Sequence, residues 1–172
     1  MTRVDRAGFR ELVRSFSRSA FRWECQGVYH EPSEKVPFRL WQEGRPDYSF
    51  MDSWVERVRG WRVEGKTFER VRMVTDPPTD YLRWMFEFTH LNVEAGEDIR
   101  WLAEADAKAL DAPTHDYYLF DDDVFVILEF GDHGVVGADI VEDAVAIEGA
   151  QRWRRLAWAN AMPHDEYMSR RN

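Results

Sequence analysis

The segment between residues 81 and 94 constrains the fold more than any other part of this chain. Its apolar side chains cover most of the circumference of a helix: Tyr81, Leu82, Trp84, Met85, Phe86, Phe88, Leu91 and Val93. Such a helix has to be buried on two sides, because a surface helix shows only one apolar stripe. The sequence Asp76-Pro77-Pro78-Thr79-Asp80 is typical of a helix start, and Gly96 is a natural C-cap.

Two segments with strand character flank this helix, at residues 69–74 and 99–102. In the first, apolar and charged side chains alternate. Val71 is therefore expected to face the core, with Arg70 and Arg72 on the other side. Parallel strands joined by a helix cross over with right-handed geometry, so the three elements predict one strand-helix-strand unit.

The last third of the chain predicts an antiparallel meander and a final helix. Strands are expected at 117–120, 124–130 and 135–141, turns at 121–123 and 131–134, and the helix at 143–161. Elsewhere we expect helices at 5–18, 38–41 and 104–110, a helix from Met51 to Gly60 or Gly65, and a strand at 21–25.

These elements predict an α/β fold of the mixed α+β kind, with one mixed β-sheet flanked by helices. The strand-helix-strand unit is followed by the meander and a C-terminal helix. Residues 1–164 are expected to form a single globular domain, and residues 165–172 a frayed tail.

Composition excludes several classes of protein. The chain has 172 residues, 44% hydrophobic and 15% aromatic, which is enough to bury a core and unlike a disordered chain. A single cysteine, Cys25, excludes a disulfide scaffold. No apolar run has the length of a membrane span, and the start has no secretory signal. We therefore expect a cytoplasmic protein that does not bind membranes.

The charge is unevenly distributed along the chain. The net charge of −9 argues against direct nucleic-acid binding. Residues 1–74 carry 15 basic and 11 acidic side chains, residues 75–151 carry 3 and 19, and residues 152–172 carry 5 and 2. The acidic middle is therefore expected either to pack against the basic ends within the fold or to meet a basic partner outside it.

Arginines follow one face of the first expected helix, at Arg6, Arg10 and Arg14. One interpretation is an interaction face for phosphate, acidic lipid or an acidic protein. The other is a face that is simply solvated, which is the usual reason for charge along one side of a helix.

No pattern in the chain names a reaction, and we expect neither a metal nor a cofactor. Cys25 lies in an alternating apolar strand and is interpreted as a structural thiol. The pair Glu87 and His90 has the spacing of a carboxylate-bridged metal site, but such sites need the motif twice. The aspartates at 121–123 are interpreted as a charged turn. Phosphate-binding loops and nucleophile elbows are absent from the sequence.

Several strings together resemble a known family. They are SAFRWE (19–24), RVRMV (70–74), TDYLRW (79–84), NVEAGEDIR (92–100) and YLFD (118–121), with Trp153, residues 157–159 and Pro163. The combination resembles a family of uncharacterised actinobacterial proteins of about this length, and it covers nearly the whole chain. Its members are often encoded beside helix-turn-helix regulators in streptomycete-like genomes, which implies a regulatory setting.

A second similarity is topological. The element order resembles half of a phospholipase D-like domain, whose members use H-x-K-x4-D, with the histidine as nucleophile and the lysine gripping phosphate. Here His115, Tyr117 and Asp122 have that spacing. Tyrosine cannot supply the fixed positive charge of the lysine, so the resemblance implies a degenerate site.

Two functions from different classes follow, and a third stays open. The first, which we favour, is a non-catalytic regulatory protein that binds a protein partner such as a helix-turn-helix regulator; a homodimer is a further alternative. The second is a phosphodiesterase-like enzyme with His115 as nucleophile or base. The third is binding of a small ligand in an aromatic pocket. The candidate binding residues are Arg70, Arg72, Asp80, Tyr81, Arg83 and Tyr117.

Overall fold

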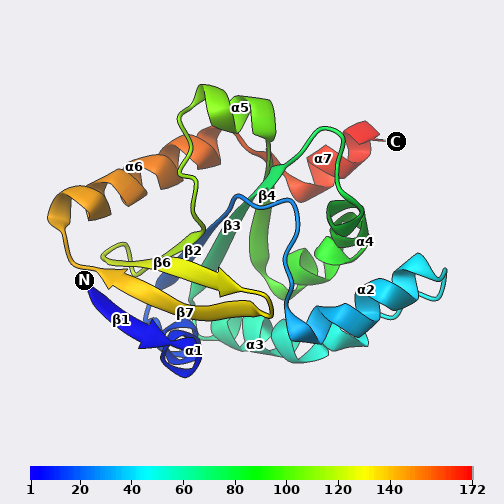
Figure 1. Cartoon of the computed structure of the whole chain (residues 1–172), viewed down its shortest axis with the longest axis horizontal. Coiled ribbons are helices and arrows are strands. Elements are labelled where there is room, and N and C mark those ends of the chain that lie inside the picture. Colours follow the sequence, from blue (N-terminus) through cyan, green and yellow to red (C-terminus); the bar gives the residue numbers. More distant parts are fainter. Residues whose placement is uncertain (172) are drawn as a thin grey trace.

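The structure is a computed structural model that describes residues 1–171, and the strands in this range form one mixed sheet of eight (Figure 1). The sheet order is β1-β7-β6-β5-β2-β3-β4-β8. The strands are β1 (Thr2–Asp5), β2 (Ser19–Glu24), β3 (Thr67–Val74), β4 (Glu97–Ala103), β5 (Tyr117–Phe120), β6 (Val124–Gly131), β7 (Gly134–Val141) and β8 (Met162–Pro163).

Helices cover both faces of this sheet. They are α1 (Arg6–Ser15), α2 (Lys35–Gln42), α3 (Asp52–Val63), α4 (Asp80–Ala95), α5 (Glu104–Ala109), α6 (Ala144–Asn160) and α7 (His164–Arg171), with short 3-10 turns η1 (Pro32–Glu34) and η2 (Ser49–Met51). In Figure 1, α5 and α6 lie on one side of the sheet, and α1 and α3 on the other. None of the helices in residues 1–171 has the length and apolar character needed to cross a membrane. The predicted mixed α/β class is confirmed.

The strand-helix-strand unit forms as predicted, from β3, α4 and β4. Strands β2, β3 and β4 are parallel neighbours. Helix α4 begins after Thr79, whose hydroxyl accepts the backbone N–H of Leu82 at 3.1 Å, and it ends at Gly96 with φ 122°. A positive φ of this kind is easily adopted only by glycine, which explains why the helix stops there.

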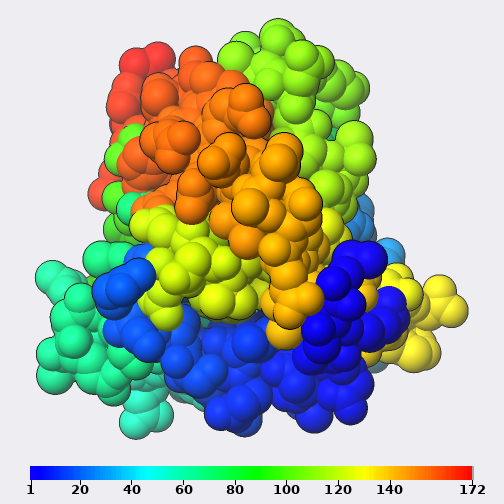
Figure 2. Space-filling view, turned by 90° about the vertical axis from the view of Figure 1, so that its left-hand side faces the viewer, coloured from blue at the N-terminus to red at the C-terminus, as the bar shows by residue number. Residues whose placement is uncertain are grey.

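The antiparallel meander β5-β6-β7 also forms as predicted, and it joins the parallel unit through β2. Strand β5 runs antiparallel to both β2 and β6. The turn between β5 and β6 connects α6 to the segment between α1 and β2: Asp121 accepts the backbone N–H of Ser17 at 2.8 Å, and the backbone oxygen of Asp122 accepts a side-chain N–H of Gln151 in α6 at 2.6 Å. Figure 2 shows this turn (yellow-green) between α6 (orange) and the first residues of the chain (blue).

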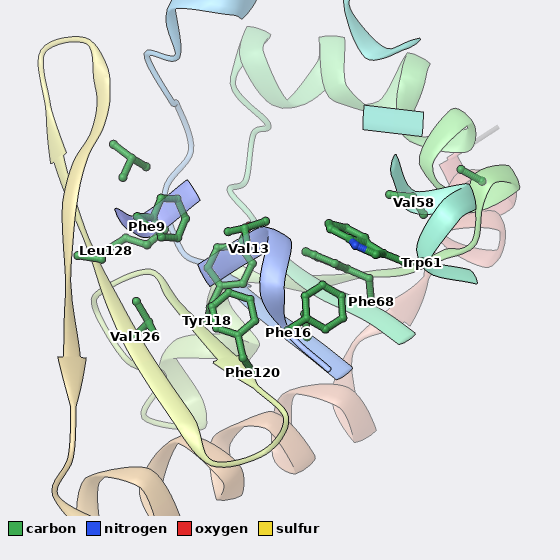
Figure 3. Close-up of a cluster of buried hydrophobic side chains, with 14 residues drawn as sticks. Phe9, Val13, Phe16, Val58, Trp61, Phe68, Tyr118, Phe120, Val126 and Leu128 are labelled. Carbon is green, nitrogen blue, oxygen red and sulfur yellow. The ribbon is translucent and has the colours of Figure 1, made fainter. Parts of the chain in front are cut away.

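The sheet is buried on both faces by aromatic clusters. On one face, α1 and α3 pack Phe16 and Trp61 against Phe68 and Tyr118 of the sheet, as Figure 3 shows. On the other face, α6 packs Trp153 against strand residues that include Trp23, Val71 and Tyr117. Val71 is fully buried, as the alternation in β3 predicts. A third cluster surrounds α4 and contains Trp84 and Trp101.

Two terminal predictions were wrong. Residues 2–5 form an edge strand on β7, so the first helix starts at Arg6 rather than residue 5 and ends at Ser15. Residues 164–171 form α7 rather than a frayed tail; residue 172 lies outside the described residues. The tail is held because the ring of Tyr167 stacks on Trp101 at 5.6 Å, while Nδ1 of His164 accepts the indole N–H of Trp101 at 3.0 Å. The single globular domain over residues 1–164 stays a prediction.

Candidate functional site

A cleft of about 480 Å³ opens on the sheet face that α1, α3 and α4 cover. Seven arginines, three glutamates and eight aromatic residues line it. We call it the arginine cleft. Its floor comes from β2, β3 and β5, and its walls come from the three helices, from residues 29–34 and from the β6–β7 hairpin. The volume lies in the range of small-molecule sites in proteins, about 300–1,000 Å³.

The floor is charged because two neighbouring strands have the same alternation. In the parallel register of β2 and β3, Arg22 lies opposite Arg70 and Glu24 lies opposite Arg72. Alternate residues share a face. All four side chains therefore project onto the face of the cleft, and all four are less than a tenth exposed.

Glu24 is the centre of this floor. Its carboxylate accepts Nε of Arg72 at 2.7 Å and Nη1 of Arg70, and Nε of Arg22 lies 3.5 Å away. Burial alone would raise the pKa of Glu24, but the charges of Arg72, Arg70 and Arg22 lower it to about 2. The carboxylate is therefore ionised at neutral pH.

Two further carboxylates complete a buried ion network with the three arginines and Glu24. Glu97 accepts Nη2 of Arg70 at 2.7 Å, together with the indole N–H of Trp54 at 2.9 Å. Asp116 accepts Nη2 of Arg22 at 2.9 Å. Both carboxylates come from the acidic middle of the chain and both arginines from its basic first part. The uneven charge is thus neutralised, at this point, within the fold.

The rim of the arginine cleft is different, because several of its charges are not neutralised. Arg6 pairs with Glu31 at 3.1 Å and also donates to backbone oxygens of the β6–β7 turn. Arg10 and Arg14 on α1, and Arg57 on α3, are exposed and line the cleft. Within residues 1–171 no carboxylate forms a salt bridge with any of these three arginines.

Three aromatic residues that line the cleft, Tyr29, Tyr81 and Phe130, form a connected group, and Tyr81 contacts Glu34. The ring centroids of Tyr29 and Tyr81 are 5.9 Å apart, and those of Tyr29 and Phe130 are 5.5 Å apart. The hydroxyl of Tyr81 donates to Glu34 at 2.6 Å. Burial raises the pKa of Glu34 to about 7.

The predicted binding residues divide between this cleft and other surfaces. Arg70, Arg72 and Tyr81 line the cleft, as do the three arginines of the predicted interaction face, Arg6, Arg10 and Arg14. Asp80 and Arg83 lie outside it and pair with each other at 2.8 Å on the exposed side of α4.

The residues of the phospholipase D-like motif lie on the opposite face of the sheet. Tyr117 is buried under α6 and donates its hydroxyl to the backbone oxygen of Ala150 at 2.8 Å. His115 is exposed near it, and partial burial lowers its pKa. The structure therefore does not bring His115 together with Arg70, Arg72 and Arg83 in one cleft.

The model of a family described as "Domain of unknown function (DUF6879)" matches residues 7–169 of this sequence. The chain belongs to this family. No curated protein matches the sequence. The prediction of an uncharacterised family is confirmed, and the match includes all residues that line the arginine cleft except Arg6.

Other polar clusters of the DUF6879 fold have structural explanations. The thiol of Cys25 donates to Asp116 at 3.1 Å, and burial raises its pKa, which keeps it protonated. Glu87 accepts the indole N–H of Trp41 at 2.8 Å and the hydroxyl of Tyr48 at 2.5 Å. Residues 1–171 contain no cluster of three or more potential ligands that could hold a metal.

Sequence reasoning missed the acidic members of the site, which are Glu24, Glu31, Glu34, Glu97 and Asp116. A signal for Glu24 was present: charged residues at 22 and 24 alternate with Phe21 and Trp23, just as Arg70 and Arg72 alternate with Val71. Two strands with matching charged faces are expected to pair when their charges complement each other. Glu34 had no comparable signal, because it lies in an irregular segment.

Proposed function

We propose that the protein is a non-catalytic binding protein whose arginine cleft takes a small organic anion with a flat apolar part. The observation that supports this most directly is the charge of the cleft. Seven arginines and only three glutamates line it, in a chain with a net charge of −9. Excess positive charge in a walled cleft attracts anions, because the low-dielectric walls focus the field.

The cleft has guanidinium groups left for a ligand. The floor arginines are neutralised by Glu24, Glu97 and Asp116, and Arg6 by Glu31. Arg10, Arg14 and Arg57 have no such partner within residues 1–171. Arginine forks fit carboxylate and phosphate groups with two parallel hydrogen bonds. A ligand anion at the rim would supply the missing counter-charge.

The walls favour a flat apolar part in the same ligand. Trp54, Phe88 and Tyr118 line the cleft beside the arginines, and the guanidinium of Arg22 lies 4.7 Å from the ring centre of Tyr118. Aromatic walls stabilise a planar group by offset or edge-to-face packing. Arg22 itself is neutralised by Asp116, so the anion is left to the rim arginines.

Calorimetric titration with 3-phenylpropanoate, a carboxylate attached to one ring, tests the proposal. We expect saturable binding with a dissociation constant below about 10 mM, weakened by added salt. The double variant Arg14→Gln/Arg57→Gln should weaken it at least about tenfold, since charge-assisted hydrogen bonds contribute about 1.5–3 kcal/mol. Arg152→Gln, at an exposed position on α6, is the matched control and should leave the dissociation constant unchanged. If Arg14→Gln/Arg57→Gln binds 3-phenylpropanoate as tightly as Arg152→Gln does, the assignment of the site is refuted. If the wild type gives no binding heat, the proposed anion-binding function is refuted.

A second candidate function is binding to a helix-turn-helix regulator encoded nearby, as the family resemblance implies. The observation that favours it is the exposure of Arg10 and Arg14 on one face of α1, without ion-pair partners in residues 1–171. An acidic surface on the regulator would complement this face. Pull-down of the purified regulator at low salt should succeed and should fail with Arg10→Glu/Arg14→Glu. Absence of a complex at low salt would remove this candidate.

A further inference from the structure

The arginine cleft contains one carboxyl group that its arginines do not neutralise. Glu24 contacts three arginines and Glu31 pairs with Arg6. Glu34 also lines the cleft, yet no cation of residues 1–171 forms a salt bridge with it. A half-buried carboxylate without a counter-charge is costly, because burial removes the water that would stabilise it. Glu34 therefore differs from the other two glutamates, because its ionised form would be stabilised by a cation from outside the chain.

The side chains near Glu34 provide a carboxylate and aromatic rings, which are groups that attract cations. Tyr81 donates its hydroxyl to the Glu34 carboxylate at 2.6 Å, which fixes the carboxylate beside that ring. Tyr29 lies next to Tyr81, and Phe130 next to Tyr29, so three rings stand close together in the cleft. Aromatic faces attract ammonium groups, and several rings with a nearby carboxylate are a recurring way to hold them.

We infer that the ligand of the arginine cleft is a zwitterion, with its anionic group at the arginines and an ammonium group at Glu34 beside the rings of Tyr29, Tyr81 and Phe130. This inference rests on the proposed function, because it assigns a second charged group of the same ligand. Its chemical class is that of an amino acid or another small molecule that joins a carboxylate or phosphate to an amine. The aromatic walls favour members with an apolar side group.

Protonation of Glu34 gives this arrangement a pH dependence. The groups that act on Glu34 are Tyr81 of α4, Glu31 at the start of its own segment, Arg72 of β3 and Glu24 of β2. With a pKa of about 7, the carboxyl is largely neutral at pH 6 and largely ionised at pH 8. An ammonium ligand gains only from the ionised form, so its advantage over a simple anion grows as the pH rises from 6 to 8.

Two probes that differ only in the amine separate this inference from the proposed function. The first is 3-phenylpropanoate, and the second is phenylalanine, which adds an ammonium group to the same skeleton. At pH 8 we expect phenylalanine to bind about tenfold more tightly, which corresponds to about 1.4 kcal/mol from the added ion pair and cation–π contact. At pH 6 the difference should fall to about threefold or less.

The variant Glu34→Gln tests the residue itself. Glutamine keeps an oxygen that can accept the Tyr81 hydroxyl, so the local structure should survive. The variant loses a negative charge that repels an anion, so it should bind 3-phenylpropanoate at least as tightly as the wild type at pH 8. It should lose the preference for phenylalanine at both pH values. Glu148→Gln, an exposed position on α6, is the matched control for removing a carboxylate and should keep the preference.

The outcomes are distinct. Equal binding of the two probes by the wild type at pH 8, or a preference that Glu34→Gln retains, would overturn the zwitterion inference and leave anion binding intact. Failure of both probes to bind would overturn both proposals. A preference that disappears only in Glu34→Gln supports the inference.

Discussion

Replacing Glu24 with glutamine should destabilise the fold strongly at neutral pH and much less in acid. The side chain is buried, and its carboxylate is the acceptor between Arg70 and Arg72 at the centre of the buried ion network. Glutamine has nearly the same shape but no charge. It therefore leaves three buried guanidinium groups with two carboxylates instead of three.

The magnitude follows from the pKa of Glu24. Folding lowers this pKa from 4.5 to about 2. Each pKa unit corresponds to about 1.4 kcal/mol, so the ionised carboxylate stabilises the folded state by about 3 kcal/mol. Removal of one partner from a buried ion pair costs a similar amount, about 3–5 kcal/mol. We expect Glu24→Gln to lower the free energy of unfolding at pH 7 by about 3 kcal/mol.

The pH dependence supplies the stronger test. Because the pKa is lower in the folded state, the stabilisation is complete above pH 4.5 and is lost as the pH falls toward 2. By pH 3 the wild type should have lost about 2 kcal/mol of it, while the variant has none to lose. The difference between the two proteins should therefore narrow to about 1 kcal/mol.

Urea unfolding at pH 7, 5 and 3, followed by tryptophan fluorescence, measures this difference directly. Linear extrapolation gives the free energy of each protein at each pH, and unchanged slopes would show that the unfolded states are comparable. Glu148→Gln is the control, since an exposed substitution usually changes stability by less than about 0.5 kcal/mol. A loss below about 1 kcal/mol at pH 7, or a loss that is the same at pH 3, would refute the reasoning.

Three further predictions concern stability. Thr79→Ala should lower the free energy of unfolding by about 1–2 kcal/mol in urea, because the hydroxyl caps α4 and donates to Gly27 at 2.6 Å; an unchanged value would contradict the cap. Gly134→Ala should lower the melting temperature more than Gly44→Ala: both have positive φ, but only at Gly134 would a Cβ meet the Glu31 carboxyl, at 2.5 Å. Burial lowers the pKa of His164, and protonation in acid removes the acceptor of the Trp101 N–H. After correction for the intrinsic amide exchange rate, which itself falls with pH, the protection factors of α7 should decrease between pH 7 and 5 in the wild type, and not in His164→Gln.

The sequence predicted the parts of the fold that depend on local patterns. The apolar circumference of 81–94, the helix start at Thr79 and the glycine at 96 are all local signals, and they place α4 correctly. The alternation of β3 correctly set the faces of Val71 and Arg70. Short terminal elements lack such signals. β1 has four residues, and α7 has only Tyr167 and Met168 as apolar residues, so tertiary contacts decide their structure.

The arginines of the candidate site could be predicted from the sequence, but their acidic partners could not. Arg70, Arg72 and the α1 arginines are visible as charged faces, but their partners come from distant segments. Asp116 is 94 residues from Arg22, and Glu97 is 27 residues from Arg70. Which strands become neighbours is a property of the whole sheet. A resemblance in spacing, as at His115, says nothing about which face of the sheet a residue occupies.

The edge pairing of β1 with β7 has a consequence for how the protein is made. It joins Thr2 to Ile140, so β1 has no partner until β7 has been synthesised. At about 5–20 residues per second, the wait lasts about 7–28 seconds. Meanwhile α1 can form only loosely, because Phe9 and Val13 pack against strands that are synthesised later. The wall of the arginine cleft that α1 provides is therefore assembled late during synthesis, and the cleft takes its final shape only after β7 has been made.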